Sequence, residues 1–155
     1  MNIVEFVAQQ TERVCENYCD FIISTHQDRL DWHPHLEGAA HIRSILEQAA
    51  ECINVNRTIA ALLRGEPPVV GQLTSLGGGE AACERLTESA AELAEAIRSM
   101  TDADLDKQYE HPRGVVLGKN VIMMPMRNMG YHIGQLNLIQ MLYGDAEFHV
   151  PKNWR

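Results

Sequence analysis

The segment that most restricts the fold of this chain runs from residue 128 to residue 140, near its carboxyl end. Asn128, His132 and Gln135 recur there at helical spacing, which places an amide, an imidazole and a second amide along one stripe of a helix. The neighbouring positions are apolar: Met124, Met129, Ile133, Leu136, Ile139, Leu142 and Tyr143. This pattern predicts an inward-facing helix that carries either a small site or a few buried amides.

The composition is that of one globular domain, which we expect to span residues 1–155. The chain has 155 residues, 45% of them hydrophobic and 22% charged, which is enough to form a core without cross-links. Its net charge of −8 comes from Glu and Asp spread along the predicted helices, with no cluster of Lys and Arg. The sequence therefore predicts neither a nucleic-acid partner nor an anionic membrane surface as partner.

The sequence also predicts no membrane segment and a cytoplasmic location. No apolar run approaches the ~20 residues that a membrane-spanning helix needs, and the amino end lacks the basic and apolar regions of a secretory signal. Cys15, Cys19, Cys52 and Cys83 fall inside predicted helices, which indicates reduced thiols. Cys15 and Cys19 share a helix face, but no further Cys or His completes a tetrahedral metal clip, so small buried side chains are the better interpretation.

Apolar periodicity and stop signals predict four long helices. The first runs from Asn2 to about His26, and Pro34 separates it from the second. Gly65 and the two prolines that follow end the second helix. The four predicted helices are residues 2–26, 37 or 38 to 64, 80–100, and 123 or 124 to 143. We therefore expect an all-α protein with the architecture of a four-helix bundle.

The connections carry weaker signals. Residues 66–79, with two prolines and four glycines, predict a flexible link, because their Gly run lacks the strand and the Lys-Ser/Thr of a phosphate loop. Thr101 and Asp104 have the spacing of a capping box for a short turn. Residues 109–119 predict a short extended connection or a tight hairpin before the last helix.

The predicted second helix carries an unusual polar line. Its members are three or four residues apart: Ser44, Glu47, Gln48, Glu51, Asn54 and Thr58. This line either faces solvent or points its middle into the bundle, toward the polar stripe of the last helix.

Several of these segments together resemble the DinB/YfiT-like superfamily. The sequence Tyr131-His132-Ile133-Gly134-Gln135, with Gly144-Asp145 after it, resembles the final helix of that family. Trp32-x-Pro34, Ser44-x-x-Glu47 and Leu62-Leu63-Arg64-Gly65-Glu66-Pro67 resemble its second helix and the flanks of that helix. The resemblance covers the order and spacing of elements over nearly the whole chain. It implies a four-helix bundle, commonly a homodimer, in which many members hold a divalent metal. Some members use a low-molecular-weight thiol, such as mycothiol or bacillithiol, in transfer or isomerisation chemistry.

The same resemblance implies a metal site at Glu51, Asn128 and His132. The family's ligands are one histidine on the second helix and a His-x-x-x-His pair on the last. His132 matches the second member of that pair, Asn128 matches the first, and Glu51 matches the histidine of the second helix, so one of three imidazoles is retained. A carboxylate and an amide oxygen make a harder, weaker set than imidazoles, but the set could hold Zn, Ni, Mn or Fe as a Lewis acid.

Two functions of different classes follow. The first is a metal-dependent hydrolase or thiol-dependent transferase, which predicts a cleft of roughly 300 Å³ or more between the second and last helices. The second is a metal-free, non-catalytic relative that serves as a small-molecule-binding or structural dimeric module. In that case Glu51, Asn128 and His132, with Gln135 or Asn54, form a buried hydrogen-bond network in which Glu51 reaches His132 or a water.

The remaining histidines are not expected to complete the site. His41 lies ten residues before Glu51, about 15 Å along one helix, and cannot share a small site with it there. His33 and His35 flank Pro34 and are expected at the surface. Tyr131 and Gln135 could orient the site or pack between helices, and no catalytic residue can be assigned.

Overall fold

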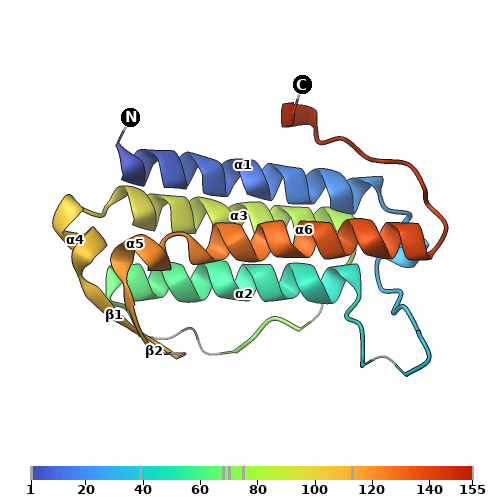
Figure 1. Ribbon diagram of the computed structural model, residues 1–155, viewed down its shortest axis with the longest axis horizontal. Helices are drawn as coiled ribbons and strands as arrows, with labels where there is room; N and C mark the ends of the chain where they lie inside the picture. Colours follow the sequence, from blue (N-terminus) through green and yellow to red (C-terminus); the bar gives the residue numbers. More distant parts are fainter. Residues whose placement is uncertain are drawn as a thin grey trace.

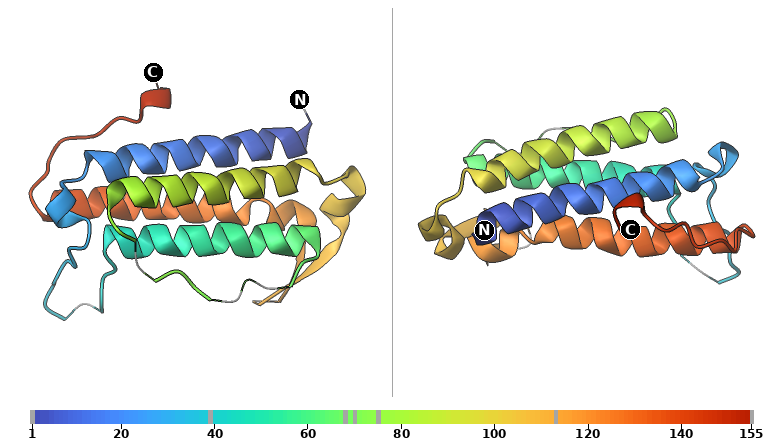
Figure 2. Two further views of the ribbon diagram at one scale, coloured as in Figure 1. Left: turned by 180° about the vertical axis from the view of Figure 1, so that it is seen from behind. Right: turned by 90° about the horizontal axis from the view of Figure 1, so that it is seen from above.

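Four long helices lie side by side in the described part of the chain (Figure 1). The computed structural model describes residues 2–38, 40–67, 69, 71–74, 76–112 and 114–154. The predicted all-α four-helix bundle is confirmed, and α1 and α2 each contact both α3 and α6 (Figure 2). The long helices are α1 (Ile3–Ser24), α2 (Ile45–Arg64), α3 (Gly79–Arg98) and α6 (Met124–Leu142).

Short elements connect α3 to α6. The helix α4 (Asp102–Asp106) begins with the predicted capping box of Thr101 and Asp104, and the predicted hairpin follows as β1 (Gln108–His111) and β2 (Gly114–Leu117). The next turn, α5 (Gly118–Val121), was not predicted. It begins at a glycine because a Cβ at Gly118 would overlap the carbonyl oxygen of Asp104. Two 3-10 turns complete the described elements: η1 (Gln27–Arg29) and η2 (Lys152–Trp154).

The start of α2 differs from the prediction. The helix begins at Ile45 and not at residue 37 or 38, because Ser44 and Glu47 form a reciprocal capping box. The Ser44 hydroxyl accepts from the Glu47 N–H at 3.3 Å, and the Glu47 carboxylate accepts from the Ser44 N–H at 2.8 Å. These two residues were interpreted as part of the polar line of a longer helix. At its other end α2 stops where predicted, at Gly65, which adopts the left-handed conformation with φ 68°.

The core fills the space between the four helices. At one end the core includes Ile45 and Leu46 of α2, and at the other it includes Val121 and Ile122 at the end of α5. A polar pair crosses the interior, where the Asn56 amide donates to the Ser89 hydroxyl at 3.1 Å. The largest fully buried side chains are Tyr18, Phe21, Ile22, Leu30, Ile45, Ile53, Ile59, Leu86, Leu93, Ile97, Ile122 and Met129.

The predicted flexible link, residues 66–79, lies only partly within the description, since Pro68, Val70 and Ser75 are outside it. One of its described residues, Leu73, is held against α2 by two hydrogen bonds. The Asn54 amide donates to the Leu73 carbonyl at 2.9 Å and accepts from the Leu73 N–H at 3.0 Å. Asn54 thus connects the link to the helix that carries Glu51.

None of the helices in the described part of the chain has the length and apolarity needed to cross a lipid bilayer. Each of the four cysteines is a free thiol; Cys15 and Cys52 are buried, and Cys19 and Cys83 are half-buried.

Candidate functional site

The imidazole of His132 lies inside the bundle and is held there by two amides. Its side chain is 5% exposed, and its Nδ1 lies 3.0 Å from Oε1 of Gln48 and 2.8 Å from Oε1 of Gln135. An amide oxygen can only accept, so Nδ1 carries the ring proton. The opposite nitrogen, Nε2, is therefore left with an unprotonated lone pair in the neutral ring.

That lone pair faces a carboxylate on the next helix. His132 Nε2 lies 3.5 Å from Oε1 of Glu51, and it has no hydrogen-bond partner within the described residues. Burial lowers the pKa of His132, the Arg43 cation lowers it further, and the bond to Gln135 opposes them. The imidazole is therefore neutral at neutral pH, and its bare Nε2 faces the Glu51 carboxyl group.

Asn128 lies one helical turn before His132, on the same face of α6. Its Oδ1 is buried and likewise makes no hydrogen bond to any described residue. The structure thus brings Glu51 and His132 together and places Asn128 on their side of α6.

Arg43 is the residue that sequence reasoning missed. Its guanidinium forms an ion pair with Oε2 of Glu51, the carboxylate whose other oxygen faces His132. The error followed from the wrong helix start, because Arg43 precedes Ser44 and lies outside α2. The capping-box spacing of Ser44 and Glu47 was the signal that could have placed Arg43 just before the N-terminus of α2.

A cleft lies between the second and last helices, as expected, and Glu51 and His132 line it, whereas Asn128 is not among its lining residues. It has a volume of about 530 Å³ and lies between α2, α6 and the segment that precedes α2. Its lining is Leu36, His41, Ile42, Arg43, Gln48, Glu51, Tyr131, His132, Gln135, Leu138, Ile139 and Leu142. Tyr131 lies at the rim, with its ring edge-on to that of His132 at 5.2 Å between centroids. We call this space the inner cavity.

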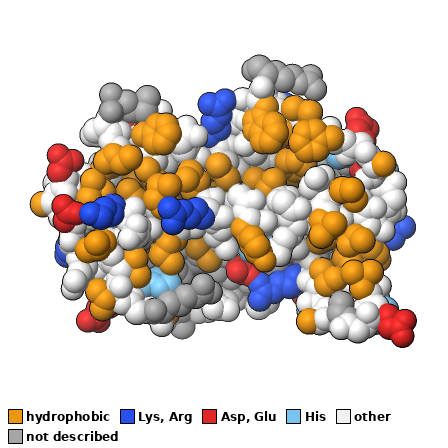
Figure 3. Space-filling view, viewed as in Figure 1, with side chains coloured by type: hydrophobic (Ala, Val, Ile, Leu, Met, Phe, Trp, Pro, Cys, Tyr) orange, Lys and Arg blue, Asp and Glu red, His pale blue; other side chains and the backbone are white. Residues whose placement is uncertain are grey.

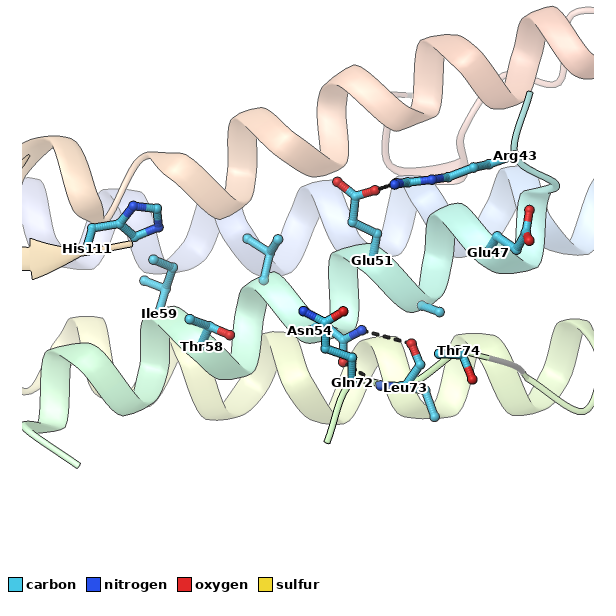
Figure 4. A pocket seen from close by; sticks show the side chains of 12 residues that line it. Arg43, Glu47, Glu51, Asn54, Thr58, Ile59, Gln72, Leu73, Thr74 and His111 are labelled. Carbon is cyan, nitrogen blue, oxygen red and sulfur yellow. Dashed lines mark hydrogen bonds and ion pairs between the residues drawn. The ribbon is translucent and has the colours of Figure 1, made fainter. Parts of the chain in front are cut away.

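A second cavity, of about 460 Å³, follows the outer side of α2 toward the hairpin (Figure 4). Asn54, Thr58, residues 72–74 and His111 line it, and Glu51 and Arg43 lie at its other end. These last two residues line both cavities. The Arg43–Glu51 ion pair is therefore part of the wall that both cavities share.

A separate cluster of ligand-type side chains lies at the start of α2. Among the residues that the structure describes, His33, His41 and Glu47 are the set of three His, Cys, Asp or Glu side chains whose donor atoms all lie within 4.8 Å of one another. His33, His35 and His41 are exposed, which was expected for His33 and His35. Sequence reasoning missed the cluster because His33 was placed on a loop of unknown path and His41 on the predicted second helix, which in the structure begins only at Ile45. The Cys15 and Cys19 pair gains no third ligand in such a set.

Comparison with known proteins bears on the fold. A scan of protein-family models and a search of curated proteins found no match. A search of solved structures matched a histidine-to-alanine mutant of the mycothiol-dependent maleylpyruvate isomerase, with a TM-score of 0.68 and 16% sequence identity. The match covers 87% of this chain and 61% of that one, so this chain spans about three fifths of its length. The two proteins share a fold. At this level of identity the match shows the fold alone, and that fold is the predicted all-α bundle.

Proposed function

We propose that the protein binds a divalent cation through Glu51, Asn128 and His132 and uses it as a hydrolase or a thiol-dependent transferase. The observation that carries this proposal is the state of His132. Its Nδ1–H is fixed by two amide oxygens, and its bare Nε2 faces the Glu51 carboxylate at 3.5 Å. Metal-binding histidines are commonly oriented in this way, by donating the other ring N–H to an oxygen.

The donor set fits a cation. His132 Nε2 and Asn128 Oδ1 are both buried and make no hydrogen bond to described residues, which is costly unless a ligand or solvent occupies the space that they face. One nitrogen, one carboxylate oxygen and one amide oxygen suit Zn, Ni, Mn or Fe(II). When bound, such an ion would polarise a carbonyl group of a substrate.

The chain's own residues define where substrates would bind. The inner cavity combines the apolar side chains of Ile42, Leu138 and Ile139 with the polar group around His132, a lining typical of small-molecule sites. Arg43 neutralises Glu51 and lines both cavities, so it could pair with a carboxylate of an anionic substrate. A low-molecular-weight thiol in one cavity and its acceptor in the other would meet at this shared wall. The thiol-dependent isomerase with the same fold supports this choice of co-substrate.

A second candidate function is favoured by the Arg43 ion pair. The guanidinium already supplies a positive charge to Glu51, so the chain could keep the bundle and the inner cavity as a metal-free small-molecule-binding module. In this alternative the Arg43 guanidinium balances the charge of Glu51 in place of a metal ion. A ligand or a water molecule then donates a hydrogen bond to Nε2 of His132.

The assembly that we propose is a homodimer through α6, formed by a single domain in the cytoplasm. Met129, Leu136 and Ile139 of α6 are buried, while Leu138, Met141 and Leu142 are exposed. Hydrophobic side chains gather over this part of the molecule (Figure 3). A helix that is apolar on more than one side is usually covered on both, and a second copy would provide that cover. Four free thiols accord with a reducing compartment.

The experiment that tests the proposed function is metal analysis of the untagged protein by inductively coupled plasma mass spectrometry. It compares the wild type with His132→Ala and Arg43→Gln, with His35→Ala as an exposed-histidine control. Melting scans with Zn, Mn, Ni and Fe(II) accompany it. We expect His132→Ala to lose an equivalent of metal, and the stabilisation by ions that accompanies it, while His35→Ala retains both.

The two candidate functions give opposite results. If His132→Ala binds as much metal as the wild type and responds equally to every ion, the metal site is refuted and the binding module remains. The variant Arg43→Gln gives a second distinction between the two candidate functions. Removal of a competing charge should raise the metal affinity if Glu51 is a ligand, and should abolish small-anion binding if Arg43 replaces the metal.

A further inference from the structure

We propose that His33, His41 and Glu47 form a second cation site, for Zn²⁺, at the surface where the segment after η1 meets the start of α2. This site is independent of the one proposed at Glu51, Asn128 and His132. Two imidazoles and a carboxylate are a common zinc donor set, and three protein ligands leave a position for water.

The donor atoms are already close to the geometry that zinc requires. His33 Nε2 lies 2.9 Å and His41 Nε2 lies 3.9 Å from the same oxygen, Oε2 of Glu47. The two imidazole rings lie side by side, with centroids 5.1 Å apart and planes inclined by 33°. Ligands at about 2.1 Å from a tetrahedral ion lie about 3.4 Å from one another. The observed separations of 2.9 and 3.9 Å fall on both sides of that value.

The carboxylate of the cluster is oriented in advance. Glu47 is the third residue of α2, and its Oε2 accepts the Ser44 N–H at 2.8 Å as part of the capping box. Burial raises the pKa of Glu47, but the Ser44 N–H and His33 outweigh it and lower the pKa overall, so the carboxylate is charged at neutral pH. The positive end of the α2 dipole opposes a cation here, and the charge of Glu47 offsets it.

The two histidines can adapt to an ion. The side chains of His33 and His41 are 44% and 68% exposed, and that of Glu47 is 37% exposed. Small rotations of exposed side chains can therefore close the remaining gap, and solvent has access to complete the coordination.

A cation here would fix one wall of the inner cavity. His41 and the two residues after it, Ile42 and Arg43, line that cavity, and Arg43 pairs with Glu51. Without an ion, Arg43 is joined to α2 by its ion pair with Glu51 and by the hydrogen bond that the Gln48 amide donates to its carbonyl, whereas His41 Nε2 lies 3.9 Å from Glu47 Oε2. With an ion, His41 would also be bound to Glu47 of α2. This would fix the position of Arg43 just before the N-terminus of the helix. The site would thus set the positions of His41 and Arg43 in the wall of the inner cavity.

The test is a Zn²⁺ titration against a chromogenic chelator, with the full-length untagged protein carrying His132→Ala. This background removes the proposed inner site, so the outcome is independent of the proposed function. We expect one equivalent of Zn²⁺ to bind. His33→Gln and His41→Gln should each weaken it at least about tenfold, the smallest loss typical even of supporting residues. His35→Gln, an exposed histidine of the same segment, should leave the affinity unchanged.

Glu47→Gln provides a further variant that spares the fold, because glutamine retains the capping box of α2. It should weaken Zn²⁺ binding as the histidine variants do, with an unchanged circular dichroism spectrum. The proposal is overturned if His132→Ala binds no Zn²⁺, or if its affinity is the same with and without His33 and His41.

Hydrogen exchange gives the second readout. In the same background, Zn²⁺ should slow exchange of the backbone amides between His33 and Arg43, and this effect should be absent in His41→Gln. Bound Zn²⁺ that leaves this segment unaffected would overturn its assignment to the cluster.

Discussion

At the scale of single residues, the protonation of His132 determines what the site can bind. The ring is neutral because its surroundings exclude water and because Arg43 lies nearby. A neutral imidazole is the form that binds a metal, whereas a charged one would repel it. The burial of His132 also makes the stability of the protein depend on pH, whichever ligand the site binds.

We expect the protein to lose stability below about pH 6.5, the ordinary pKa of histidine, through His132. Its pKa is lowered in the folded state, so the unfolded chain takes up the proton first as the pH falls. The contribution of His132 to the free energy of unfolding is fully present above about pH 6.5. It is lost as the pH falls toward the lower pKa that His132 has in the folded state. The measurement is urea denaturation at pH 7.5 and 5.5 after treatment with a chelator.

His132→Gln should reduce the difference between the two pH values, and His35→Gln should leave it as in the wild type. An equal pH dependence in the wild type and in His132→Gln would show that the imidazole is not buried in its neutral form.

At the scale of elements, the position at which α2 begins decides where the site residues lie. Ser44 ends the preceding segment and caps the helix, which directs Arg43 toward Glu51. A longer helix would have carried Arg43 on a regular helical face instead. The capping box is therefore both a stabilising feature and a positioning one.

Ser44→Ala should destabilise the protein by about 0.5–2 kcal/mol, the usual cost of losing a helix N-cap. The hydroxyl is buried and accepts the Glu47 N–H, so alanine leaves that donor unsatisfied. Chemical denaturation monitored by circular dichroism measures the effect. Thr58→Ala in the middle of α2 is the control and should change the stability by less than about 0.5 kcal/mol. If Ser44→Ala also lowers the free energy of unfolding by less than about 0.5 kcal/mol, the cap does not stabilise the protein as expected.

The elements also show which features could be predicted from the sequence. Helical periodicity, Pro34 and Gly65 predicted the long helices, because each of these signals is local. The paired amides on His132 and the contact with Glu51 depend on how α2 and α6 are aligned, which no local pattern contains. The pairing of Glu51 with His132 was expected from the family resemblance, whereas the polar line of the second helix left open whether its middle faces solvent or the last helix. Arg43 and the cluster of His33, His41 and Glu47 depend on the path of an irregular segment, for which periodicity gives no signal.

At the scale of the whole molecule, stability depends on the centre of the bundle. Leu86 is fully buried within the core shared by α1, α2, α3 and α6. We expect Leu86→Ala to cost about 2–5 kcal/mol, because the surrounding helices cannot close the resulting cavity. Urea denaturation gives the value, with Val115→Ala in the exposed hairpin as the control. A cost below about 1 kcal/mol would contradict the burial described here.

The exposed apolar side of α6 leads to a prediction about assembly. The double variant Leu138→Glu, Met141→Glu should be monomeric, because charges within an apolar contact are strongly disfavoured. Light scattering after size-exclusion chromatography gives the mass of the wild type and of the variant. Val115→Glu, on the hairpin, should leave the mass unchanged. A monomeric wild type would refute the dimer directly.

Both ends of the described chain lie on the α1 side of the molecule. α1 begins at Ile3, and η2 returns to α1, where Asn153 and Lys152 bond to Arg13 and Asp20. Figure 1 shows that α2 lies on the opposite side of the bundle. A protein attached to a sensor surface through either end would therefore present α2 to the flowing solution. Immobilised binding assays of candidate thiols and metal ions would thus leave the cavity along the outer side of α2 accessible.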